Sequence, residues 1–93
     1  MNASSEYDGA KSRLSAGIVS YALDVPIEGI LGSGRVSAQV TFARQLAMYL
    51  CYTAFGLSLA RVAAAFRRDR STVSHACHRI EDRRDEPQFD LWI

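Results

Sequence analysis

Apolar residues recur along most of the chain at the three- and four-residue spacing of amphipathic helices. The pattern is longest over 43–54, where it continues for about three turns until Gly56 stops the helix. An earlier stripe over 10–23 ends before Pro26, which favours the first turn of a short helix. The face of this first stripe that we expect in the core consists of Leu14, Gly17, Ile18, Tyr21 and Ala22.

The second half of the chain predicts two further helices joined by a tight turn. Ser58 is a good N-cap for the first of them, whose apolar face lies over 59–66. Asp69 or Ser71 caps the second, over 71–84, and no segment shows the alternation of a strand. The sequence therefore predicts an all-α fold, a small helix-turn-helix domain of four to five helices. The buried stripe of its last helix would be Val73, Ala76, Cys77 and Ile80.

A length of 93 residues fits one small domain. We expect a disordered polar tail over 1–10, the helical domain over 11–85 and a second tail over 86–93. The apolar runs are too short to span a bilayer, and the start of the chain has no secretory leader pattern. The expected location is therefore the cytoplasm, at the nucleoid, with no membrane partner. Cys51 and Cys77 fall on core stripes, which favours buried structural thiols over a disulfide.

The net charge of +1 conceals an uneven distribution of charge. Residues 61–84 carry seven arginines and three acidic residues, whereas residues 85–93 carry three acidic residues and no basic one. Positive charge is therefore gathered around the last predicted helix, as expected of a protein that binds a polyanion.

The outer face of that helix carries hydroxyls, imidazoles and a guanidinium. In a helix-turn-helix motif the second helix enters the major groove of DNA, and its first residues meet base edges. Hydroxyls can donate or accept there, while arginine and histidine suit guanine and phosphate. The pattern alone fits a merely solvated helix face equally well. The residues concerned are Ser71, Thr72, Ser74, His75, His78 and Arg79.

The stretch "ARQLAMYLCYTAFGLSLARVAAAFRRDRSTVSHACHRIE" resembles the C-terminal DNA-binding domain of the bacterial replication initiator DnaA. Its last part matches the family signature, whose usual form is G-R-D-H-T-T-V-L-H-A-C-R-K-I-E. The segment "GIVSYALDVPIEGILG" is similar to the first helix and turn of the family, so the resemblance covers about residues 13–84. It implies a protein that binds double-stranded DNA at DnaA-box-like sites and regulates the initiation of chromosome replication.

The resemblance also implies which residues contact DNA. Asp69, Ser71 and Thr72 stand where the family reads bases, and His75 stands at a phosphate-contacting position. Further members come from the same signature, from the loop ahead of the long helix and from the start of that helix. The full predicted set is Arg35, Arg44, Gln45, Arg68, Asp69, Arg70, Ser71, Thr72, Ser74, His75 and Arg79.

The chain departs from the family pattern at several places. Arg70 replaces the signature histidine and Ser74 replaces a hydrophobic residue, so the preferred DNA sequence can differ from the DnaA box. The loop ahead of the long helix is arginine-rich in the family and places an arginine in the minor groove. Here the loop offers Arg35 and then Arg44, so the minor-groove arginine is either Arg35 or replaced by Val36. No P-loop motif is present, so we do not expect the chain itself to act as an initiator.

Catalytic and metal-binding interpretations are weak. His75 and His78 lie one turn apart on the outer face, but Cys77 belongs to the core stripe, so too few ligands converge for zinc. A core thiol beside a DNA-binding face also lacks the pocket that a nucleophile needs. We therefore expect no enzyme activity, no metal, no cofactor and no small-molecule substrate.

The end of the chain, "PQFDLWI", supplies an alternative function. Its "QFDLW" resembles the bacterial sliding-clamp-binding motif, with Gln88, Phe89, Leu91 and Trp92 as the docking residues. Trp92 could equally fold back on the helices. The alternatives to DNA-dependent replication control are a protein-interaction module that acts on the clamp or on initiator-inactivation machinery, and a transcriptional repressor.

Overall fold

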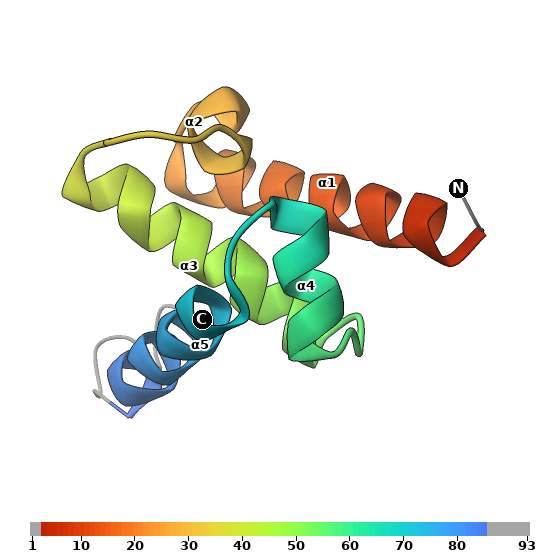
Figure 1. The fold of residues 1–93 in the computed structure, drawn as a ribbon. Coiled ribbons are helices and arrows are strands. Elements are labelled where there is room, and N and C mark those ends of the chain that lie inside the picture. The colour runs from red at the N-terminus through yellow and green to blue at the C-terminus, as the bar shows by residue number, and fades with distance from the viewer. Residues whose placement is uncertain (1–2, 86–93) are drawn as a thin grey trace.

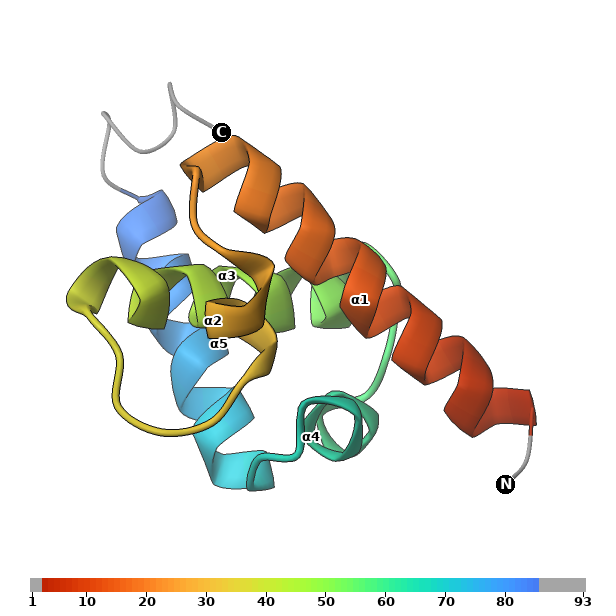
Figure 2. The same cartoon turned by 90° about the horizontal axis from the view of Figure 1, so that it is seen from above.

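The computed structural model describes residues 3–85, which form five helices and no strand (Figure 1). This arrangement confirms the predicted all-α helix-turn-helix fold. α3 lies at the centre and contacts each of the other four helices, with α1 and α5 on opposite sides of it (Figures 1 and 2). The helices are α1 (Ala3–Leu23), α2 (Ile27–Leu31), α3 (Ala38–Thr53), α4 (Leu59–Phe66) and α5 (Arg70–Arg84).

The core forms where α3 meets its neighbours, and it buries the stripes that the sequence predicted for α3, α4 and α5. Ala43 and Ala47 of α3 are fully buried, as are Val62 of α4 and both Val73 and Ile80 of α5. Burying a valine or isoleucine side chain stabilises the fold by roughly 2 kcal/mol, and an alanine methyl contributes less. The prediction that helical periodicity marks the core is therefore confirmed for these three helices.

Both cysteines are buried, free thiols, as predicted. Cys51 of α3 donates to the Ser15 hydroxyl of α1, with 3.2 Å between sulfur and oxygen. Burial raises the pKa of Cys51, and burial together with nearby Glu81 raises the pKa of Cys77 to about 11. Both residues therefore remain protonated at neutral pH, which suits structural roles.

The predicted inward face of α1 is wrong. Leu14, Ile18 and Tyr21 are 54%, 47% and 92% exposed. A Cβ added at Gly17, which the prediction placed on the same face, would meet no atom within 4 Å. A different face packs on α3 and α4, and it consists largely of small residues: Ser12, Ser15, Ala16 and Val19.

Small side chains explain this choice of face because they let α1 approach its neighbours closely, and the polar atoms that they bury are satisfied. The Ser12 hydroxyl donates to the Gly9 carbonyl at 2.8 Å. The Ser15 hydroxyl accepts the thiol hydrogen bond from α3. A serine whose hydroxyl is hydrogen-bonded carries little desolvation penalty when it is buried. The face with the small residues can therefore pack in the core while the larger apolar residues of α1 remain exposed.

The first helix also begins earlier than predicted. α1 starts at Ala3, so the prediction of a disordered tail over 1–10 is wrong from that residue onward. The Asp8 carboxylate accepts two hydrogen bonds from the Arg61 guanidinium of α4, at 2.9 and 2.6 Å. This bidentate pair fixes the polar first turns of α1, and apolar periodicity could not reveal it.

α4 is capped at both ends, and its left-handed C-cap forms the turn to α5. Ser58 caps α4, as predicted, by accepting from the Arg61 backbone N–H at 3.2 Å. At the other end, Arg67 has φ 57° and ψ 49°, and its N–H donates to the Ala64 carbonyl. The next N–H, that of Arg68, donates to the Ala63 carbonyl at 2.9 Å. These two bonds form a Schellman motif, the usual way to end a helix sharply.

The left-handed conformation of Arg67 leads to a prediction about stability. A residue with a Cβ is strained there and glycine is not, so Arg67→Gly should raise the free energy of unfolding by about 1 kcal/mol. Urea denaturation followed by circular dichroism measures the change. Arg35→Gly is the matched control, because positive φ among the described non-glycine residues is confined to Asp24 and Arg67. Equal effects of the two substitutions would contradict this explanation.

The ion pair between α1 and α4 predicts a pH-dependent stability. The Arg61 guanidinium holds the pKa of Asp8 below its ordinary value, so the pair stabilises the fold at neutral pH. That contribution declines once the pH falls below the ordinary pKa of an aspartate, about 4, and it is lost as the pH passes through the lower pKa that Asp8 has in the folded state. Asp8→Asn should therefore lower the Tm by a few degrees at pH 7, and the difference from the native chain should close toward pH 2.

Thermal melts across this pH range provide the test, with Asp82→Asn, at an exposed position of α5, as the control. Added salt should also reduce the effect at pH 7, because the Arg61 side chain is 47% exposed. A difference in Tm that is constant with pH would exclude the ion pair as its cause.

Candidate nucleic-acid interface

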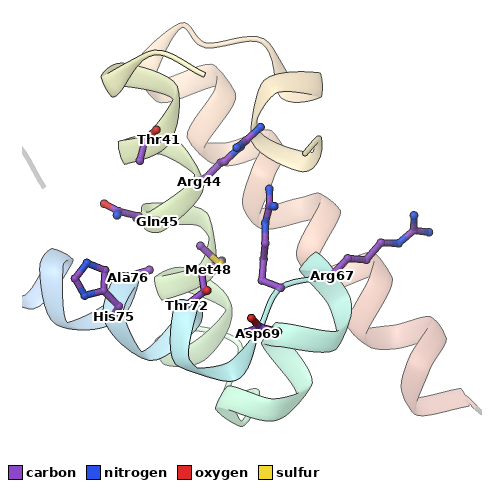
Figure 3. Close-up of a pocket in the computed structure, with 10 residues that line it drawn as sticks. Thr41, Arg44, Gln45, Met48, Arg67, Asp69, Thr72, His75 and Ala76 are labelled. Atoms are coloured by element: carbon purple, nitrogen blue, oxygen red, sulfur yellow. The ribbon is translucent and has the colours of Figure 1, made fainter. Parts of the chain in front are cut away.

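An open hollow of about 570 Å³ lies between α3, the turn before α5 and the first turns of α5 (Figure 3). It brings together side chains that are far apart in the sequence, because α5 crosses α3 where their apolar faces meet. Thr41 and Arg67 also line it, although the sequence analysis named neither as a site residue. The predicted DNA-contacting residues in its lining are Arg44, Gln45, Arg68, Asp69, Thr72 and His75.

The wall that α5 contributes is polar and accessible. Thr72 and His75 are exposed, whereas Ala76, on the same side of the helix, is buried against α3. Gln45 of α3 is half-buried and lies on the same side of the hollow as His75 (Figure 3). Hydroxyl, imidazole and amide groups from two helices therefore share one surface that can donate and accept hydrogen bonds.

Two of the predicted arginines bind the backbone of the protein itself. Arg44 donates from Nε to the Gly29 carbonyl at 2.7 Å and from a terminal nitrogen to the Gly34 carbonyl at 2.9 Å. Arg68 donates to the Gly32 carbonyl at 2.6 Å. Both arginines therefore fasten the segment that joins α2 to α3. Their phosphate contacts stay a prediction, for which each guanidinium retains further N–H donors.

The electrostatics of the two arginines agree with this geometry. Burial, and to a smaller degree the charge of Arg68, lowers the pKa of Arg44. An arginine remains charged even so, because its ordinary pKa lies far above neutrality. Two like charges are held near each other by backbone carbonyls, so the hollow keeps a concentrated positive charge beside the start of α5.

Other predicted residues lie outside the lining of the hollow. Arg35 is exposed on the segment between α2 and α3, ahead of the Ser37 cap of α3. Ser71 and Arg79 are exposed on α5. Their predicted contacts with DNA are not tested by this geometry, but all three side chains are accessible to a large ligand.

Arg70 and Ser74, two of the positions at which the chain departs from the usual signature, lie on one flank of α5. Arg70 and Ser74 are one turn apart, and each is two residues, about 200°, from Thr72 around the helix. They therefore flank the side of α5 that is turned away from the hollow. Arg70 is exposed and Ser74 is half-buried, so these two departures alter the edge of the helix that lies opposite Thr72.

Asp69 and Asp82 set the limits of the polar face of α5. Asp69 occupies the N-cap position, one of the two predicted, but its side chain makes no capping hydrogen bond, and α5 begins at Arg70 rather than at residue 71. Its carboxylate lies at the edge of the hollow (Figure 3). Asp82 is exposed one turn beyond His78 on the outward face. The acid-free part of α5 is therefore confined to its first turns.

Arg67 was not among the predicted site residues, although comparison with the family signature could have identified it. Arg67 stands where the usual form of the signature has its first glycine, and the structure shows the left-handed conformation that glycine favours. Arg67 contributes to the lining of the hollow, and its exposed side chain extends toward α1 (Figure 3). The chain thus adds a cation at a position where it strains the backbone.

The described residues bear only in part on the predictions about metal binding, membrane spanning and docking by the tail. Within residues 3–85 no group of three or more His, Cys, Asp and Glu side chains is arranged to hold a metal. The helices of the same part of the chain include none that is both long and apolar enough to cross a membrane. The predicted docking residues Gln88, Phe89, Leu91 and Trp92 lie outside the described residues, as does the tail over 86–93.

Comparison with known proteins places these features in a family. Residues 16–80 match the family described as bacterial dnaA protein helix-turn-helix. The chromosomal replication initiator protein DnaA of Tropheryma whipplei (strain Twist) is 41% identical over 59 residues, which are 63% of this chain and 12% of that protein. The DnaA of Bifidobacterium animalis subsp. lactis is 44% identical over 62 residues, 66% of this chain and 10% of the relative.

The protein named DnaA 2 of Chlamydia trachomatis is 42% identical over 65 residues, which are 70% of this chain and 14% of that protein. The matched region is therefore a small part of each of these relatives, and no solved structure gives a significant match. Since the family pattern covers most of the chain and coincides with the helices that form the hollow, the chain belongs to the family of bacterial DnaA helix-turn-helix domains.

Proposed function

We propose that this chain binds double-stranded DNA through the first turns of α5 and thereby regulates the initiation of chromosome replication. The observation that carries the proposal is the position of Thr72 and His75, exposed on the helix that follows the turn and adjacent to Gln45 of α3. Residues at this end of the second helix are those that reach base edges in a helix-turn-helix motif. Membership of the DnaA family supports the same interface.

In this proposal the major groove is read by short polar side chains. The hydroxyls of Ser71 and Thr72 donate to or accept from base edges, and the Asp69 carboxylate, which makes no capping bond, accepts from a cytosine amino group. His75 and Arg79, four residues apart on α5, bind phosphates beside the groove. The positive N-terminal end of the 15-residue helix attracts a further phosphate.

The segment between α2 and α3 supplies a second contact. Arg44 and Arg68 hold its carbonyls, and Arg35 projects from it into solvent. We infer that these bonds position Arg35 for the neighbouring minor groove while α5 occupies the major groove. The two tethering arginines then act on affinity in two ways, through their own charge and through the placement of Arg35.

Control of replication follows from competition for sites. The relatives whose sequences match are chromosomal replication initiators, and the family match over residues 16–80 includes the residues that line this hollow. A domain that recognises the same boxes can occupy them and change how many remain for the initiator. This mechanism requires DNA binding and no catalytic step.

Salt dependence and a single charge change test the DNA contact. If about five phosphates are neutralised, log affinity for a DnaA-box duplex should fall against log salt with a slope near −4 to −5. Arg79→Gln should weaken binding to all duplexes and reduce the slope by about 1. Fluorescence anisotropy titrations at several salt concentrations measure both quantities.

Arg13→Gln is the matched control, because it removes the same charge from an exposed position on α1. Deletion of residues 88–93 should leave the affinity for DNA unchanged. If the intact chain binds no DNA and instead retains a sliding clamp until those residues are deleted, the DNA proposal is wrong and the protein-interaction alternative is supported.

Selection of bound sequences from a random duplex library tests the identity of the site. We expect a DnaA-box-like sequence that differs at the base pairs near Arg70, because this side chain replaces the signature histidine. Arg70→His should shift that preference and leave the positions read by Thr72 unchanged. Recovery of a sequence unrelated to the box would instead support a transcriptional repressor.

A further inference from the structure

The outer face of α1 carries a continuous apolar stripe. Tyr7, Leu14, Ile18 and Tyr21 are 66%, 54%, 47% and 92% exposed. Their spacing of seven, four and three residues places them on one side of the helix. Large exposed apolar side chains in the described residues are few, and four of the six lie here, so this is a patch and not a random scatter.

The stripe is separate from the candidate DNA interface. α1 packs on α3 and α4 through Ser15, Ala16 and Val19, which lie on a different face of the helix from the stripe. Figures 1 and 2 place α1 and α5 on opposite sides of α3, and the N-terminal end of α1 extends past the other helices. A large partner can therefore cover the stripe and leave the hollow beside α5 open.

We propose that a second copy of this chain covers the stripe, with the two α1 helices antiparallel. Tyr7 and Tyr21 each lie seven residues from Leu14, so the stripe is symmetric about Leu14. A two-fold axis at this residue places Leu14 against its equivalent, and it places Tyr7 of one copy against Tyr21 of the other. Homodimers commonly have this symmetry, in which one patch serves both partners.

The size of the patch agrees with a dimer. At about 200 Å² for a whole side chain of this kind, the exposed fractions of the four residues offer roughly 500 Å² per copy. Two copies then bury roughly 1,000 Å², the lower limit for a specific protein interface. The exposed residues Ala10 and Ala22 beside the stripe add to this area.

The residues beside the stripe leave room for a second copy of the chain to approach closely. A Cβ added at Gly17 would meet no atom within 4 Å, so the surface has open space there for a neighbouring side chain. Lys11, a charged residue along this face, is half-buried, so only part of its side chain is exposed beside the stripe. In the antiparallel register the two Lys11 residues are six positions apart, about 9 Å along the axis, which limits their repulsion.

Sedimentation equilibrium of the intact chain without DNA tests the proposal independently of the proposed function. The native chain should dimerise, and Tyr21→Glu should raise the dissociation constant about 100-fold or more, because each dimer contains the change twice. Tyr52→Glu is the matched control: Tyr52 is 40% exposed on α3, outside the stripe, and its substitution should leave the constant unchanged. A chain that stays monomeric up to about 1 mM, or a dimer indifferent to Tyr21→Glu, overturns the proposal.

Cross-linking tests the register. Leu14→Cys should give covalent dimers with a short thiol-reactive cross-linker, because the axis places this residue against its equivalent. The native cysteines are buried and should not compete. Tyr52→Cys should give no covalent dimer under the same conditions. Dimers from both variants, or from neither when sedimentation shows a dimer, overturn the pairing of the two α1 helices at Leu14.

Discussion

Burial of one side of α5 against α3 determines which residues of the last helix face solvent. Val73, Cys77 and Ile80 cannot leave the core without exposing large apolar areas, so the helix cannot rotate about its axis. The same constraint places Thr72 and His75 beside α3, where they line the same hollow as Gln45. The candidate interface is therefore a consequence of core packing: polar side chains occupy positions that the apolar ones leave exposed.

Much of this architecture could be predicted because three helices have a single strong apolar stripe. For α1 the rule fails, and the reason is physical. Its larger apolar residues and its small residues lie on different faces, and the small face packs better because it permits a closer approach to α3. Hydrophobic periodicity measures transfer from water and contains no information about fit between surfaces. The paired hydroxyl of Ser15 and the bidentate contact of Asp8 further stabilise this orientation of α1, and the partners of both residues are far away in the sequence.

The residues of the candidate site also include some whose position the sequence could predict and others whose role it could not. The exposure of Thr72 and His75 follows from helical spacing alone, so the sequence predicted it correctly. The tethering roles of Arg44 and Arg68 could not be predicted in that way, because their acceptors are backbone carbonyls of another segment, and any residue can provide a carbonyl. Arg67 could have been identified, since a non-glycine residue at the signature glycine indicates a strained backbone.

Arg68 connects the turn before α5 to the segment that carries Arg35, and Arg44 of α3 holds the same segment. Neither part can shift alone without breaking short hydrogen bonds to partly desolvated guanidinium groups. If both parts touch one duplex, the distance between their contacts is set by the protein and not by the nucleic acid. Recognition then depends on groove width and helical pitch as well as on base identity, so a stiff or narrow-grooved stretch beside the core site alters affinity without any change in the bases that α5 reads.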